Sequence, residues 1–112
     1  MGSQISLHER TLRAVENADG EVGTETLWHF QQVGDMITAE YEDQNIADGH
    51  LMGVFDGDTW DARYYQVTED GETVTGRSEG TVEELPDGRL VVEEHWESTD
   101  GQGTTVLEEV LR

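Results

Sequence analysis

The chain has 112 residues, of which 26 are acidic and 6 are basic, and its formal net charge is −20. This length suits one domain with one hydrophobic core, so we expect residues 1–112 to form a single domain, with residues 1–6 as a flexible N-terminal segment. The absence of cysteine excludes disulfides and thiolate metal sites. No apolar run approaches the ~18 residues of a membrane span, and the charge opposes phosphate binding, so we expect no membrane and no nucleic-acid partner.

The acidic residues are spread along the whole chain and alternate with apolar ones, unlike the clustered acids of a disordered tail. All six basic residues are Arg. Such a surface repels itself at low ionic strength, whereas near 1 M salt the screening length falls to about 3 Å and the repulsion largely disappears. The composition therefore predicts a cytoplasmic protein of an extreme halophile.

Asp-Gly pairs divide the chain at residues 19–20, 48–49, 56–57, 70–71, 87–88 and 100–101. Asp-Gly suits the positive-φ positions of tight hairpin turns. The predicted strands between the turns cover residues 7–16, 24–33, 36–42, 45–55, 60–68, 72–84, 90–98 and 104–111, with a polar loop at 17–23. Eight antiparallel strands of this length can close on themselves, which removes exposed edges. The predicted fold is all-β, a closed lipocalin-like (calycin-like) barrel; an open twisted sheet is the alternative.

Two of the predicted strands contain an ambiguity. Leu7, Leu12 and Val15 would also fit a short helix, although a strand agrees better with the β-segments that follow. Asp48-Gly49 falls inside the fourth strand as either a turn or a β-bulge. We expect a bulge, because it keeps the strand long and helps to curl the sheet.

The densest aromatic segment is the strand from Trp60 to Thr68. One face carries Trp60, Ala62, Tyr64 and Gln66, and the other carries Asp61, Arg63, Tyr65 and Val67. Side chains of a strand alternate between its faces, so Arg63 and Tyr64 cannot both point inward. The sequence leaves open which of them does, and hence whether the barrel centre is charged or aromatic.

Glu94 is the most informative polar residue. It shares a strand face with Leu90, Val92 and Trp96, which predicts that it points inward unless it lies at the barrel mouth or a bulge turns it. A carboxylate in apolar surroundings must be paired, hydrogen-bonded or protonated. The expected partners are Arg63 and the hydroxyls of Tyr41 and Tyr64. Such a contact can be purely structural, or it can orient a polar ligand.

Aromatic side chains with a few amides and hydroxyls are the usual lining of a small-molecule pocket. The candidate ligand-binding residues are Trp28, Phe30, Gln32, Tyr41, Arg63, Tyr64, Gln66, Glu94 and Trp96. An ordinary aromatic core is the alternative interpretation. The four histidines lack the spacing of metal ligands, and no catalytic motif is present, so we expect no metal, no cofactor and no catalytic residues.

Several short pieces carry a family resemblance. They are Trp28-His29-Phe30-Gln31-Gln32, Thr38-Ala39-Glu40-Tyr41, Gly49-His50-Leu51-Met52-Gly53, Arg63-Tyr64-Tyr65-Gln66-Val67, Gly71-Glu72 with Thr75-Gly76, Leu85-Pro86-Asp87-Gly88-Arg89, and Glu94-His95-Trp96. On these residues the chain resembles a small family of uncharacterised bacterial and archaeal β-proteins of about this length, and it looks like a haloarchaeal member. Some members carry the label N-acetylglutamate synthase. An acetyltransferase of the usual kind holds pyrophosphate on a glycine-rich loop that opens a helix, which the residues here do not suggest.

The sequence therefore leads to three hypotheses. The first is a protein that binds a small, partly aromatic or apolar ligand inside the barrel. The second is a structural or interaction module that has a solid core and acts as a homodimer. The third is an enzyme that uses Glu94, Arg63 and Tyr64.

Overall fold

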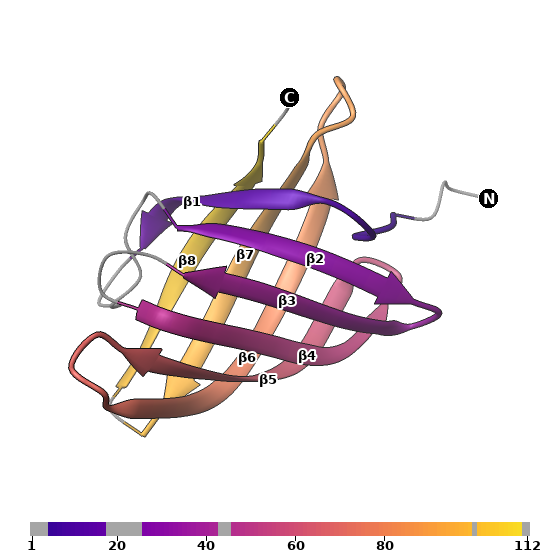
Figure 1. The fold of residues 1–112 in the computed structure, drawn as a ribbon. Coiled ribbons are helices and arrows are strands. Elements are labelled where there is room, and N and C mark those ends of the chain that lie inside the picture. Colours follow the sequence, from indigo (N-terminus) through magenta and orange to yellow (C-terminus); the bar gives the residue numbers. More distant parts are fainter. Residues whose placement is uncertain (1–4, 18–25, 43–45, 100, 111–112) are drawn as a thin grey trace.

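A computed structural model describes residues 5–17, 26–42, 46–99 and 101–110. The strands are β1 (Thr11–Asn17), β2 (Leu27–Val33), β3 (Met36–Glu42), β4 (Ile46–Asp56), β5 (Thr59–Thr68), β6 (Thr73–Glu84), β7 (Leu90–Ser98) and β8 (Gly101–Glu109). Each strand pairs antiparallel with the next, and β8 pairs with β1, so the sheet closes into a barrel (Figure 1). The predicted closed barrel is confirmed, and the open sheet is wrong. Among the described residues, no helix is long and apolar enough to cross a membrane.

The bulge at Asp48-Gly49 is confirmed. β4 is one continuous strand, and its register against β5 shifts between Ile46 and Asp48. β8 begins at Gly101 rather than at residue 104, so the sheet includes three residues that we expected in a loop. Predicted strand and loop residues at 18–25, at 45 and at 111 lie outside the described residues.

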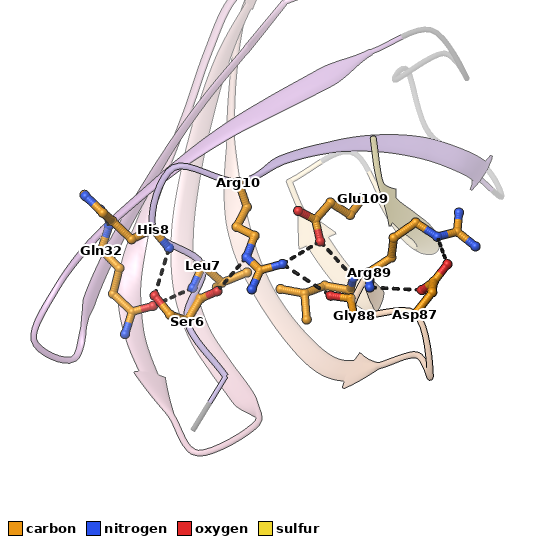
Figure 2. Close-up of polar contacts among 10 residues, drawn as sticks. Ser6, Leu7, His8, Arg10, Gln32, Asp87, Gly88, Arg89 and Glu109 are labelled. Atoms are coloured by element: carbon orange, nitrogen blue, oxygen red, sulfur yellow. Dashed lines mark hydrogen bonds and ion pairs between the residues drawn. The ribbon is translucent and has the colours of Figure 1, made fainter. Parts of the chain in front are cut away.

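The first predicted strand is only partly correct, because β1 begins at Thr11 and residues 7–10 turn across one end of the barrel. The Leu7 side chain is fully buried, and the Leu7 amide donates a hydrogen bond to Gln32 Oε1 at 2.9 Å. The backbone N–H of Gln32 in turn donates to His8 Nδ1 at 3.1 Å (Figure 2). Gln32 therefore anchors the segment that closes this end. The expectation of a flexible segment over residues 1–6 stays a prediction, since residues 1–4 are not described.

Arg10 links the N-terminal segment to the last two strands (Figure 2). Its Nη1 lies 2.7 Å from Glu109 Oε1, which also accepts a hydrogen bond from the Leu90 amide at 3.0 Å. Its Nε donates to the Ser6 carbonyl at 3.1 Å. The side chain of Glu109 is largely buried, and a charged pair shielded from water is stronger than an exposed one. This contact therefore ties β7 and β8 to the segment that precedes β1.

The alternation of side chains along β5 settles whether Arg63 or Tyr64 points inward. Trp60, Ala62 and Gln66 are buried, and Tyr64 is half-buried and packs against the core. Arg63 points outward, with 66% of its side chain exposed. The centre of the barrel is therefore aromatic, and the candidate residue Arg63 does not line it.

Glycines in β4 and β6 make room for aromatic rings on the neighbouring strands. Three such pairs lie directly opposite in register: Tyr41 with Gly49, Trp60 with Gly80, and Tyr64 with Gly76. A Cβ atom added at Gly80 would lie 2.4 Å from Cε2 of the Trp60 ring, far inside van der Waals contact. Glycine inside a strand commonly marks such a close approach. The glycines thus let large rings lie flat against the inner wall.

Candidate functional site

A chain of hydrogen bonds inside the barrel crosses three adjacent strands. The Trp60 indole Nε1 on β5 donates to Ser78 Oγ on β6 at 2.9 Å. Ser78 Oγ donates in turn to Glu94 Oε2 on β7 at 2.6 Å. All three residues are buried. The single Ser78 hydroxyl therefore accepts from one side chain and donates to the other, which fixes both.

The sequence of β6 explains why these groups can meet. Gly76, Ser78 and Gly80 share the inward face of this strand, and all three are small. Ser78 stands opposite Ala62 on β5 and opposite Trp96 on β7. Large residues at these positions would fill the space that the Trp60 ring and the Glu94 carboxyl occupy. The small inward face of β6 thus creates the site.

The second carboxyl oxygen of Glu94 is the feature that a ligand could use. Glu94 is 6% exposed, and within the described chain the only hydrogen bond to its carboxyl group is the one from Ser78 to Oε2. No fully enclosed side-chain polar atom of the described residues lacks a partner. It follows that Oε1, which accepts no hydrogen bond from these residues, still reaches accessible space. A carboxyl oxygen held in this way can accept a hydrogen bond from a bound molecule.

Burial raises the pKa of Glu94 to about 7, because an apolar environment disfavours the charged carboxylate. The Ser78 hydrogen bond and the nearby His95 favour the ionised form and partly oppose this effect. Near neutral pH the Glu94 carboxyl therefore exchanges between a protonated form, which can donate a hydrogen bond, and a charged form, which only accepts.

A second polar pair lies toward the end of the barrel opposite the N-terminal segment. The Tyr41 hydroxyl donates to Gln66 Oε1 at 2.9 Å, and both residues are buried. The Trp28 ring stacks on the Tyr41 ring with a centroid distance of 4.9 Å. The pair thus combines a fixed amide with an aromatic wall.

Two further aromatic contacts extend that wall. The Phe30 and Trp60 ring centroids lie 5.4 Å apart in a tilted arrangement. The Trp96 indole Nε1 donates to Thr105 Oγ1 at 3.1 Å. Buried indoles usually find a hydrogen-bond partner in this way, while their rings remain available for apolar contact.

The structure brings most of the candidate residues together on the inner wall of the barrel. Those that point inward are Trp28, Phe30, Tyr41, Tyr64, Gln66, Glu94 and Trp96. The inward orientation of Glu94 is confirmed, but the expected partners were wrong, since Ser78 holds it. The sequence analysis did not identify Ser78 and Thr105 as partners of Glu94 and Trp96. A small hydroxyl residue in a strand reveals only which face it lies on, and not which side chain it contacts. The role of the inward candidate residues in binding a ligand stays a prediction.

Two candidate residues do not belong to this wall. Gln32 holds the N-terminal segment at the closed end. Arg63 lies outside and pairs with Asp61, with Nη1 3.3 Å from Oδ1. An enzyme site made of Glu94, Arg63 and Tyr64 is therefore wrong, because one member stands on the other side of the sheet. In the described part of the chain, no three His, Asp or Glu side chains gather to hold a metal ion.

The sequence matches a protein-family model described as avidin-like protein over residues 5–110, which is most of the chain. That family has a calycin-type barrel. No curated protein and no solved structure gave a significant match.

Proposed function

Because the chain belongs to the avidin-like family, we propose that it binds a small, partly apolar molecule inside its barrel. The observation that carries the proposal is the Glu94 carboxyl. One of its oxygens is fixed by Ser78, and the other accepts no hydrogen bond within the described chain. Because this oxygen reaches accessible space in largely apolar surroundings, a hydrogen bond from a bound molecule would stabilise it.

The chemistry of the wall defines the class of ligand. A group with an N–H or O–H donor would bind to Glu94 Oε1, and an apolar or aromatic body would contact the rings of Phe30, Trp60 and Trp96. Pockets for small molecules combine apolar walls with a few fixed polar groups in this way. A ligand with a negative charge near Glu94 would be rejected when this carboxyl is ionised.

Native mass spectrometry of the protein purified in volatile salt tests for a retained small molecule, and calorimetric titration then measures affinity for the molecule found. Biotin, a ligand of avidin-like barrels, is included as a probe in the same titrations. We expect Ser78→Ala to weaken binding roughly 10-fold or more, because hydrogen bonds to charged groups contribute about 1.5–3 kcal/mol. The control is Glu93→Gln, since Glu93 is the neighbour of Glu94 on β7 but is exposed on the outer face. Equal affinities of Ser78→Ala and wild type would contradict the proposal.

We also propose that the protein works in the salt-rich cytoplasm of an extreme halophile. The support is the net charge of −20, spread over a small barrel. Circular dichroism during stepwise dilution of KCl should show the β-sheet signal falling as the concentration drops well below ~1 M, because screening weakens. A fully folded protein in ~10 mM salt, where the screening length is about 30 Å, would refute this assignment.

A homodimeric interaction module is the second candidate function, and a separate observation favours it. Several large apolar side chains stay exposed on the outer face of the sheet, namely Val33, Met36, Met52, Val54 and Tyr65. The two functions are compatible, because one uses the inner face of the sheet and the other uses the outer face. The N-acetylglutamate synthase label has no comparable support, since the described residues form strands and no helix.

A further inference from the structure

A hollow of about 660 Å³ lies on the outer face of the sheet, where strands β4, β5 and β6 run side by side (Figure 1). This volume falls within the range of small-molecule pockets, which is about 300–1,000 Å³. The residue Glu94 does not line this hollow. The outward side chains of the three strands that line it are His50, Met52, Arg63, Tyr65, Thr75 and Arg77.

Two stacked rings line one part of the hollow. His50 on β4 stands opposite Tyr65 on β5, and the ring centroids lie 5.2 Å apart with an interplanar angle of 19°. The His50 Nε2 atom lies 3.1 Å from Asp48 Oδ1, which holds the imidazole in place. Tyr65 is 44% exposed, so a further flat ring can pack against this pair.

Two guanidinium groups line the neighbouring part of the hollow. Arg63 on β5 and Arg77 on β6 stand directly opposite each other, and like charges in such positions repel. The Asp61 Oδ1 atom lies 3.3 Å from Arg63 Nη1 and 3.4 Å from Arg77 Nε, so one carboxyl oxygen faces two cations. Within the described residues, the Nη atoms of Arg77 have no hydrogen bond and no ion pair.

Other arginines of this chain are neutralised at shorter distances. Arg10 Nη1 lies 2.7 Å from Glu109 Oε1, and Arg89 Nη1 lies 2.7 Å from Glu108 Oε1. The chain has 26 acidic residues, so carboxylates are abundant. The sharing of one carboxylate by the arginine pair is therefore a feature of the hollow and does not result from a shortage of acids.

We propose that this hollow is a second binding site, which takes a flat aromatic molecule that carries one carboxylate. Arg63 and Arg77 donate to the carboxylate, because the planar fork of a guanidinium group matches its two oxygens. The aromatic body lies on the Tyr65 ring and on the side chain of Met52, which is 61% exposed. This site differs from the one inside the barrel, where an ionised Glu94 opposes negative charge.

The charges around the hollow restrict the ligand further. Glu97 on β7 also lines the hollow and stands opposite Arg77. A phosphate or a dicarboxylate would bring a second negative charge close to Glu97, which is unfavourable. The net charge of −20 repels every anion at low ionic strength, whereas near 1 M salt the screening length of about 3 Å leaves mainly direct contacts. A single carboxylate held by hydrogen bonds therefore fits this surface in molar salt.

An NMR titration of the isotope-labelled full chain with naphthoate in ~1 M KCl tests the proposal. The pH is set to about 8, above the pKa of Glu94 near 7, so that the interior carboxylate is ionised. Side-chain Nε–H signals of Arg63 and Arg77 should shift and saturate together with backbone signals of β4 to β6. Naphthamide, which has the ring without the charge, and acetate, which has the charge without the ring, should each bind roughly 10-fold more weakly or worse.

Arg77→Gln should weaken naphthoate binding roughly 10-fold, because it removes a charge-assisted hydrogen bond. Tyr65→Ser should weaken it by removing the stacking surface. Arg13→Gln, the same charge change on the exposed outer face of β1, is the control and should bind as wild type does. Dispersed NMR spectra verify that each exposed-site variant is folded.

Equal affinities for naphthoate and naphthamide would overturn the proposal, as would an Arg77→Gln variant that binds like wild type. Saturable shifts confined to residues outside β4 to β6 would place the anion elsewhere and overturn it too. Absence of binding by a chain that light scattering shows at twice 12.5 kDa would mean that a second copy covers the hollow, which also overturns it. None of these outcomes depends on Ser78, so they leave the proposed site inside the barrel untouched.

Discussion

Replacing Glu94 by Gln should remove a pH dependence of stability that amounts to about 3 kcal/mol between roughly pH 4.5 and pH 7. In the folded protein the pKa of Glu94 is raised from 4.5 to about 7 by burial. Between these values the unfolded chain releases a proton that the folded chain keeps. Rising pH therefore favours unfolding of wild type until the folded carboxyl also ionises near pH 7. Glutamine has no proton to release and can still accept the hydrogen bond from Ser78.

Urea denaturation of both proteins in molar KCl, from about pH 5 to pH 8, measures this difference. The stability of Glu94→Gln relative to wild type should increase with pH and level off above the pKa of Glu94, near 7. The other carboxyl groups are shared by both proteins, so their titration cancels in the comparison. Glu93→Gln, a change of the neighbouring exposed carboxyl, should show no such trend. A relative stability that stays constant over this pH range would mean that Glu94 is ionised throughout.

Gly80→Ala should lower the free energy of unfolding by about 3 kcal/mol. The new Cβ would lie 2.4 Å from the Trp60 ring, which is buried. The ring also packs on Phe30 and donates to Ser78, so it cannot move without weakening both contacts. Overpacking of a core typically costs ~1–3 kcal/mol, and loss of a buried hydrogen bond adds to this.

Urea denaturation followed by tryptophan fluorescence measures the effect of Gly80→Ala. Glu79→Ala is the matched control, because residue 79 is the neighbour of Gly80 but is exposed on the outer face of β6. The control should change stability by less than ~0.5 kcal/mol, as is usual for surface positions. If Gly80→Ala were as stable as the control, the Trp60 ring would not be fixed against β6.

Sequence periodicity predicted the local features of this protein well. The Asp-Gly pairs at residues 56–57, 70–71 and 87–88 marked hairpin turns, and the alternation along β7 placed Glu94 on the inner face. The bulge near Asp48 and the antiparallel meander followed from the same signals. These features depend on residues close together in the chain, since turn chemistry and a two-residue period are local properties.

Only the tertiary structure decided which groups meet. The strand face that β5 turns toward the core placed Tyr64 inside and Arg63 outside. The register of β6 between β5 and β7 brought Ser78 to Glu94. Gln32 lies on the same strand face as Trp28 and Phe30, yet its side-chain oxygen accepts a hydrogen bond from Leu7 in the N-terminal segment. Such contacts join residues far apart in the chain, so they depend on strand register and barrel closure, which no local pattern encodes. The sequence by itself determined an acidic chain of antiparallel strands and predicted one inward carboxylate, and the folded barrel determined which side chain holds that carboxylate.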